Sequence, residues 1–247
     1  MNFWLLITEL GDEKAYMAFV PIIYFMVDRR IGWQLFCALI LSSLTVLTLK
    51  NFLKIPRPPE HLWKTHASGY GFPSGHATVS ATFWSYLAFK IRKIWFFIFA
   101  FVITLLVGLS RVHLGVHYAR DVLGGFIIGI SIGLISSSIE FKLSRGLKLI
   151  GVIISSLIIF SLYPLIGNYA FRLGGYLLGF GFAHVLSVDF LSCKHPKNLK
   201  HRFLMLAVGL SVLFFGSIGQ SPMVYPLSGF FGCMIPNYIG DRLEVPK

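Results

Sequence analysis

Long apolar segments recur along the whole chain and are separated by short polar turns. A hydrocarbon core of about 30 Å needs roughly 20 apolar residues in each crossing helix. By this criterion the pattern predicts an all-α fold, a polytopic transmembrane helical bundle of eight or nine spans. The predicted spans lie near residues 15–27, 32–53, 76–91, 94–111, 121–141, 147–165, 171–190, 203–219 and 222–240. The count is eight or nine because the first segment is short and only Gln220–Ser221 separates the last two.

The composition agrees with a membrane protein. Hydrophobic residues make up 55% of the 247 positions, charged residues only 13%, and a soluble domain of this length would be less apolar. A net charge of +12 can indicate a nucleic-acid partner, but the basic residues lie in short turns, so we expect no nucleic-acid binding. The three cysteines are far apart, which predicts neither a disulfide framework nor a zinc site. The first 14 residues lack a basic n-region, so we expect no cleaved signal peptide.

The basic turns predict which way the bundle faces. Lys and Arg cluster at 29–30, 90–93, 142–148 and 194–202, in alternate turns. The positive-inside rule assigns these turns to the cytoplasm. The intervening turns at 54–75 and 112–120 are then expected together on the non-cytoplasmic face.

Small residues recur within one predicted span. Gly125, Gly129 and Gly133 are spaced four apart, which places them on one face of a helix. Such a stripe lets helix backbones approach closely in a membrane. It predicts tight packing and carries no information about chemistry.

The first of three polar segments ends the second span. Lys50 lies in its last turn, and Pro56 and Pro58 hold Arg57 in an extended turn. Arg offers a planar fork for two phosphate oxygens, and Lys offers a compact charge. The alternative is that both residues only anchor a helix end at the lipid headgroups.

The second segment, Pro73-Ser74-Gly75-His76, begins the third span. A Pro–Gly turn before a helix leaves backbone N–H groups that attract an anion, aided by the helix dipole. Ser74 adds a hydroxyl donor, Gly75 allows close backbone approach, and His76 lies beside the anion. Alternatively, Ser74 is only an N-cap.

The third segment links the fourth and fifth spans and contains Arg111, His117 and Asp121. His117 and Asp121 are four residues apart, so the carboxylate can accept a hydrogen bond from one imidazole nitrogen and leave the other free as a nucleophile. The alternative is an interfacial pair in a solvated helix start. His113 is outside this spacing and is assigned a structural role.

Together these segments resemble the type 2 phosphatidic acid phosphatase superfamily, and all three motifs match across residues 50–121. The resemblance implies a phosphatase core within the first five to six spans, residues 1–146. Residues 147–247 carry no motif and are predicted to be additional transmembrane helices of unknown role.

The resemblance also implies the catalytic roles. His117 is the expected nucleophile, Asp121 orients it, and His76 is the acid and base. The phosphate is expected to be bound by Lys50, Arg57, Ser74, Gly75 and Arg111. No carboxylate cluster suited to magnesium lies on this face, so we expect no metal and no cofactor.

The resulting hypothesis is an integral membrane phosphatase that hydrolyses a lipid phosphate or diphosphate monoester through a phosphohistidine. We expect it in a bacterial inner membrane, with its site facing the periplasm or exterior. The substrate stays open among phosphatidic acid, phosphatidylglycerol phosphate, polyprenyl diphosphate, a sphingoid phosphate and lipid A, and so does the oligomeric state.

Two alternatives remain. A lipid phosphotransferase would use the same intermediate with another acceptor. An anion or lipid transporter would use polar residues inside the membrane, and His184 and Asp189 are its candidates. Local hydrogen bonding is the simpler role for those two, because no repeat symmetry relates the halves of the chain.

Overall fold

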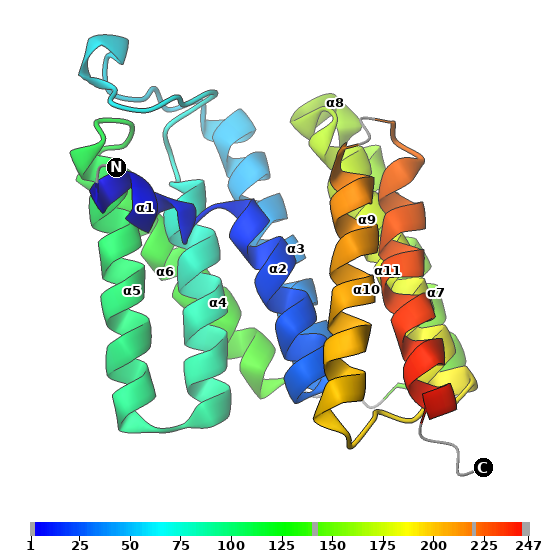
Figure 1. Cartoon of the computed structure of the whole chain (residues 1–247). Helices are drawn as coiled ribbons and strands as arrows, with labels where there is room; N and C mark the ends of the chain where they lie inside the picture. Colours follow the sequence, from blue (N-terminus) through cyan, green and yellow to red (C-terminus); the bar gives the residue numbers. More distant parts are fainter. Residues whose placement is uncertain (1–2, 140–142, 219–220, 244–247) are drawn as a thin grey trace. The chain divides into compact units, whose positions relative to one another are not determined.

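The computed structural model describes residues 3–139, 143–218 and 221–243, which form helices joined by turns and loops (Figure 1). These residues contain no β-strand, so the predicted all-α fold is confirmed. The α-helices are α1 (Phe3–Glu9), α2 (Glu13–Ile22), α3 (Arg29–Leu53), α4 (Gly75–Ile91), α5 (Ile94–His113), α6 (Ala119–Ser138), α7 (Arg145–Ser161), α8 (Tyr163–Ile166), α9 (Tyr169–His184), α10 (Leu199–Ile218) and α11 (Val224–Leu243). Two π-helical turns, η1 (Ile23–Val27) and η3 (Val185–Phe190), extend α2 and α9, and a 3-10 turn, η2 (Glu60–Leu62), lies between α3 and α4.

Every predicted span overlaps one of these helices, although residues 140–141 and 219 at the ends of two spans lie outside the described ranges. By length and composition, four helices of the described chain can cross a membrane: α3, α5, α6 and α9 with η3. The protein is thus an integral membrane protein, while the count of eight or nine spans stays a prediction. The short helix α1 has no counterpart among the predicted spans.

The chain divides into two compact units by packing. Unit 1 comprises Met1–Tyr16 and Gln34–Glu140, and unit 2 comprises Met17–Trp33 and Phe141–Lys247. The division predicted at residues 146/147 concerns function and stays a prediction. The division by packing differs from the predicted division in one respect: residues 17–33 pack with the C-terminal helices.

Close packing of α4 against α6 is the main feature of unit 1. The stripe of Gly125, Gly129 and Gly133 faces α4, and a Cβ added at Gly129 would lie 2.3 Å from the carbonyl oxygen of Thr78. Only a residue without a side chain fits at this distance, which confirms the predicted close approach. The contact holds the start of α6 against the start of α4.

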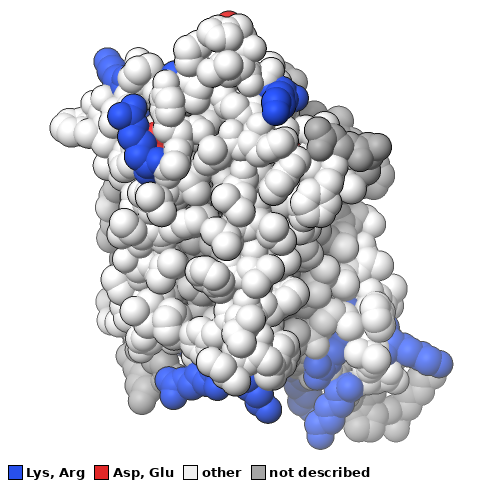
Figure 2. Space-filling model, turned by 90° about the vertical axis from the view of Figure 1, so that its left-hand side faces the viewer, with Lys and Arg blue, Asp and Glu red and all other residues white. Residues whose placement is uncertain are grey.

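One face of the protein has a broad band without charged side chains. Figure 2 shows a face whose middle carries no Lys, Arg, Asp or Glu, with the basic side chains gathered at its ends. Large apolar side chains are exposed along α5, including Trp95, Ile98 and Phe101. An uncharged band of this kind suits a helix that faces lipid.

Polar residues inside unit 2 form local pairs. The Tyr24 hydroxyl lies 2.9 Å from Nδ1 of His184, and Lys148 forms an ion pair with Asp189 at 2.6 Å. These contacts confirm local hydrogen bonding for His184 and Asp189. They leave the transporter alternative without its best candidate residues.

Candidate active site

Four helix ends meet at one end of unit 1. Helix α3 ends at Leu53 and α5 ends at His113, while α4 begins at Gly75 and α6 begins at Ala119. All three polar segments lie at these ends or in the loops that join them (Figure 1). Segments far apart in the sequence are thereby brought to one place.

Backbone contacts fix the two loops to each other and to the helices. The N–H of Lys64 donates to the carbonyl oxygen of Leu114 at 2.9 Å, and the N–H of Ser74 donates to that of Asp121 at 2.9 Å. Gly115 has a φ of +73°, and a Cβ there would lie 2.1 Å from the carbonyl oxygen of Leu62. Both the conformation and the contact require glycine.

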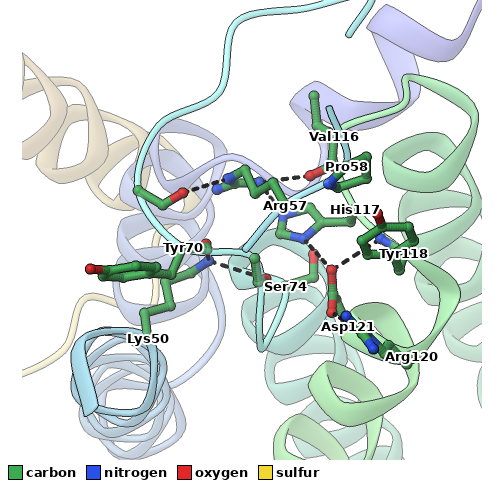
Figure 3. Close-up of polar contacts among 12 residues, drawn as sticks. Lys50, Arg57, Pro58, Tyr70, Ser74, Val116, His117, Tyr118, Arg120 and Asp121 are labelled. Carbon is green, nitrogen blue, oxygen red and sulfur yellow. Dashed lines mark hydrogen bonds and ion pairs between the residues drawn. The ribbon is translucent and has the colours of Figure 1, made fainter. Parts of the chain in front are cut away.

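His117 and Asp121 form a buried pair. Nδ1 of His117 lies 3.4 Å from Oδ2 of Asp121, and that oxygen also accepts the backbone N–H of Tyr118 at 3.0 Å (Figure 3). His117 is 3% exposed and Asp121 is fully buried. Because a carboxylate only accepts hydrogen bonds, we assign the proton of the neutral imidazole to Nδ1. Nε2 then carries the lone pair.

Arg57 contacts the opposite side of the same imidazole. Its Nη1 lies 2.8 Å from Nε2 of His117 and donates to the carbonyl oxygen of Val116 at 2.9 Å. Its Nε and Nη2 donate to the carbonyl oxygens of Gly69 and Ser68, at 3.0 and 2.8 Å. A guanidinium can only donate, so this contact also requires the lone pair on Nε2. The two neighbours of His117 therefore select the same tautomer.

The environment of His117 favours its neutral form. Burial, together with the nearby cations Arg57, Lys50 and Arg111, lowers the pKa of His117 from 6.5 to about 4, although the hydrogen bond with Asp121 opposes the shift. A neutral imidazole near pH 7 has a nucleophilic nitrogen available.

Ser74 and Gly75 lie at the start of α4. Ser74 occupies the N-cap position, but its side chain makes no capping hydrogen bond. Its hydroxyl oxygen is fully buried and has no hydrogen-bond partner among the described residues. The structure therefore gives no support to the alternative in which Ser74 acts only as an N-cap.

Lys50 reaches the loop that precedes α4. Its Nζ donates to the carbonyl oxygens of Tyr70 and, at 3.3 Å, Gly71. The side chain is half-buried at the end of α3. Lys50 is thus turned inward to the loop that carries the second polar segment, which differs from a residue that only anchors a helix at the headgroups.

Arg111 and His76 both contact the N-terminal segment, which no sequence motif connects to the site. Nη1 of Arg111 donates to the Thr8 hydroxyl at 2.7 Å, and Nε2 of His76 lies 3.8 Å from Oδ2 of Asp12. The sequence did show acidic residues at 9–13, but no spacing related them to residues 60 to 100 positions later. His113, predicted to be structural, stacks on Trp4 with ring centroids 4.8 Å apart.

Comparison with known proteins identifies the family. The family model of the PAP2 superfamily matches residues 31–145. Phosphatidylglycerophosphatase B of Bacillus subtilis (strain 168) is 32% identical over 152 residues, which cover 56% of this chain and 74% of that protein. Glucose-6-phosphatase 3 of Mus musculus is 31% identical over 182 residues and 61% of this chain, which spans about half the length of that relative.

A solved structure agrees with these relatives. The crystal structure described as the first transmembrane PAP2 type phosphatidylglycerolphosphate phosphatase, from Bacillus subtilis, has a TM-score of 0.50 and 30% sequence identity. The match covers 55% of this chain and 76% of that chain. The resemblance drawn from the three motifs is confirmed: this chain belongs to the PAP2 superfamily, among its membrane-embedded phosphoric ester hydrolases.

Proposed function

We propose that the protein hydrolyses a lipid phosphate or diphosphate monoester, without a metal ion, through a phosphohistidine on Nε2 of His117. The observation that carries the proposal is the position of His117 between Asp121 and Arg57. One neighbour orients the imidazole, and the other is a cation suited to bind phosphate oxygens.

The first step transfers the phosphoryl group. The lone pair of Nε2 attacks phosphorus in line, the ester P–O bond breaks, and His76 gives its proton to the departing oxygen. The imidazole of His117 gains positive charge as the P–N bond forms. The buried carboxylate of Asp121 stabilises that charge through Nδ1–H.

Water completes the cycle. His76, now neutral, removes a proton from a water molecule as its oxygen attacks phosphorus. The P–N bond then breaks, and its electron pair returns to Nε2 of His117. Inorganic phosphate leaves and both histidines are restored.

Buried donors near the start of α4 support phosphate binding. The Ser74 hydroxyl and Nε of Arg111 are buried without a hydrogen-bond partner among the described residues. Leaving a buried polar group unsatisfied costs about 1–3 kcal/mol. Phosphate oxygens would satisfy both, and Lys50, Arg57 and the backbone N–H of Gly75 would complete the set that stabilises the transition state.

The positive charge of the site comes from side chains. Among the described residues, no group of three or more His, Cys, Asp or Glu could hold a metal ion. Lys50, Arg57 and Arg111 together carry the charge that would otherwise come from a divalent cation. The proposed reaction is therefore metal-independent.

Apolar side chains beside the site favour a lipid substrate. Phe52 and Leu53 at the end of α3 are 76% and 41% exposed, and Leu62 in the following loop is 50% exposed. These residues offer apolar surface to a tail that stays in the bilayer while its phosphate reaches His117. The relative named as a phosphatidylglycerophosphatase agrees with a lipid, whereas the glucose-6-phosphatase makes a sugar phosphate the competing substrate class.

The proposal places the site on the non-cytoplasmic face. Lys90 lies in the last turn of α4, and Arg92 and Lys93 lie in the turn that joins α4 to α5, at the helix ends opposite the site. The positive-inside rule puts that turn in the cytoplasm. In intact cells, a membrane-impermeant maleimide should label a Glu60→Cys variant, whereas labelling of a Lys93→Cys variant should require lysis. The reverse pattern would contradict the orientation.

Trapping the intermediate tests the mechanism. Purified protein in detergent is mixed with ³²P-labelled lipid phosphate and quenched in alkali, in which phosphohistidine survives. We expect label on the wild type and none on His117→Ala. On His76→Ala the label should both form and decay more slowly, because His76 acts in both steps. Label on His117→Ala would disprove the nucleophile assignment.

A substrate panel tests the reaction. It contains the five lipid classes named above and glucose 6-phosphate, each with and without an added alcohol acceptor, with His117→Ala as the blank. Phosphate release from a lipid supports the proposal. A preference for glucose 6-phosphate, or transfer to the acceptor in place of phosphate release, would overturn it.

A further inference from the structure

The N-terminal segment of unit 1 is part of the wall of the active site. Thr8 accepts a hydrogen bond from Arg111, and Trp4 stacks on His113. A Cβ added at Gly11 would lie 2.5 Å from Cγ1 of Val107 and 3.1 Å from Cβ of His76. The backbone of Gly11 is therefore in close contact with α4 and α5 and fixes the position of the next residue, Asp12.

Asp12 faces the second histidine of the site. Its Oδ2 lies 3.8 Å from Nε2 of His76, with the two side chains 30% and 26% exposed. From this contact we infer that Asp12 is a positioning residue, whose carboxylate orients the imidazole of His76 and favours its protonated form. The inference rests on the proposed role of His76 as acid and base. It gives the site two His–Asp pairs, one for the nucleophile and one for the proton donor.

The charges around His76 explain the need for a carboxylate. Burial disfavours a proton on the imidazole of His76, and the nearby cations Arg111, Arg57 and Lys50 add to this effect. An acid must hold that proton until the ester bond breaks. Asp12 supplies an opposite charge, so it offsets part of the repulsion from the phosphate-binding cations.

The geometry assigns a separate task to each nitrogen of His76. If Nε2 faces Asp12, Nδ1 is the nitrogen that gives its proton to the departing oxygen. The 3.8 Å separation is an ion-pair distance and longer than a hydrogen bond. Catalytic hydrogen bonds often shorten only when substrate binds, so this separation suits a positioning pair.

A purely structural role for Asp12 makes a different prediction. If Asp12 only holds the N-terminal segment in place, its loss should weaken the reaction of every substrate equally. If Asp12 acts through His76, its loss should be felt only where the leaving oxygen needs a proton. The basicity of the leaving group separates the two roles.

The test compares two phosphate monoesters by kcat/KM, which reports steps up to departure of the leaving group. Dioctanoyl phosphatidic acid releases a strongly basic alkoxide that needs protonation, whereas p-nitrophenyl phosphate releases a weakly basic nitrophenolate. The full-length chain is assayed in detergent as wild type, Asp12→Asn, Asp12→Glu and Thr8→Val. Glu60→Gln, which removes an exposed carboxylate from the α3–α4 loop, is the control.

We expect Asp12→Asn to lower kcat/KM about 10-fold or more for the lipid, which is part of the roughly 10²–10⁴-fold that acid catalysis contributes, and less than about 3-fold for the aryl ester. Asp12→Glu should recover part of the loss. Thr8→Val, which acts through Arg111 and phosphate binding, should lower both values alike, and Glu60→Gln should change neither. Equal losses for both substrates in Asp12→Asn, or no loss for either, would overturn the inference. A wild type that hydrolyses none of the five lipid classes of the panel would instead refute the proposed function.

Discussion

Nη1 of Arg57 lies 2.8 Å from Nε2 of His117, the nitrogen proposed to attack phosphorus. The guanidinium therefore already lies where the oxygens of a phosphate on that nitrogen would be bound. A phosphate oxygen that accepts the Nη1–H would free the lone pair of Nε2. Binding of the substrate phosphate would therefore also free the nucleophilic nitrogen of His117.

This relationship predicts that lysine cannot replace Arg57. The three guanidinium nitrogens donate to separate acceptors at 2.8–3.0 Å, and an ammonium on a flexible stem cannot reproduce that planar geometry. We expect Arg57→Lys to lower kcat/KM about 10²-fold or more, as for the loss of one transition-state donor.

The measurement is phosphate release from the best lipid of the panel. Arg92→Lys, on an exposed arginine at the other end of α4, is the matched control and should retain wild-type kcat/KM. Equal activity of the two variants would contradict the assignment.

Asp121→Asn tests the tautomer of His117. The amide of asparagine can donate to Nδ1, which moves the imidazole proton to Nε2 and removes the nucleophilic lone pair. We expect kcat to fall about 10²–10⁴-fold with little change in KM, because phosphate binding is left intact. The position of Oδ2 also accepts the N–H of Tyr118, so an amide nitrogen there leaves that N–H without its acceptor, and the melting temperature should fall modestly as well. A large loss of stability with normal kcat would show that Asp121 serves the fold alone.

Protonation of His117 should occur only in acid. Its pKa is lowered to about 4, so the neutral form persists as the pH falls from 7 to about 4. An unfolded chain binds the proton near pH 6.5 instead, so this residue makes the folded protein less stable as the pH falls below that value. Ring ¹⁵N shifts of histidine-labelled protein, assigned by comparison with His117→Gln, should show Nδ1–H down to about pH 4. A midpoint near 6.5 would contradict the burial argument.

Removal of divalent metal ions should leave activity unchanged. Arg57 and Arg111, with Lys50 beside them, supply positive charge where a metal-dependent phosphatase would hold an ion. The measurement is phosphate release after dialysis against excess EDTA, with and without added magnesium. A loss of activity that magnesium restores would refute a metal-independent reaction. An unrelated magnesium-dependent phosphatase, treated in parallel, should lose its activity and verify that chelation was complete.

Sequence patterns predicted the helices well because hydrophobic length alone determines where a chain can cross a membrane. They predicted the grouping of Lys50, Arg57 and His117 because basic turns alternate with the turns that hold the motifs. Both kinds of information are local or periodic. The tautomer of His117, in contrast, depends on Arg57, 60 positions away, and only the structure shows that contact.

The contribution of the N-terminal segment was missed for the same reason. Thr8 and Asp12 precede the first predicted span and lie in no motif, and their partners Arg111 and His76 are distant in the sequence. Nothing in the hydropathy pattern predicts the short helix α1. The packing of residues 17–33 with the rest of unit 2 was also not predictable from the sequence. In lipid, the complementarity of helix surfaces determines which apolar helices associate, and a hydropathy pattern does not contain that information.

Close packing at the glycine stripe supports the fold that holds the site. A Cβ at Gly129 would lie 2.3 Å from the carbonyl oxygen of Thr78, a backbone atom that cannot move aside cheaply. Gly129→Ala should therefore push α6 from α4 and cost about 1–3 kcal/mol of stability, as overpacking does. For a chain of this size each kcal/mol lowers the melting temperature by about 2–4 °C.

Gly151→Ala is the matched control for that packing argument. Gly151 is an exposed residue of α7 with no heavy atom within 4 Å of the added Cβ, so alanine should be neutral or slightly stabilising through its higher helix propensity. The readout is the melting temperature of each purified variant in the same detergent. Because Ser74 and Asp121 are held at the starts of α4 and α6, Gly129→Ala should also lower kcat/KM, whereas Gly151→Ala should leave it unchanged. Equal melting temperatures for the two variants would show that the glycine stripe does not set the spacing of these helices.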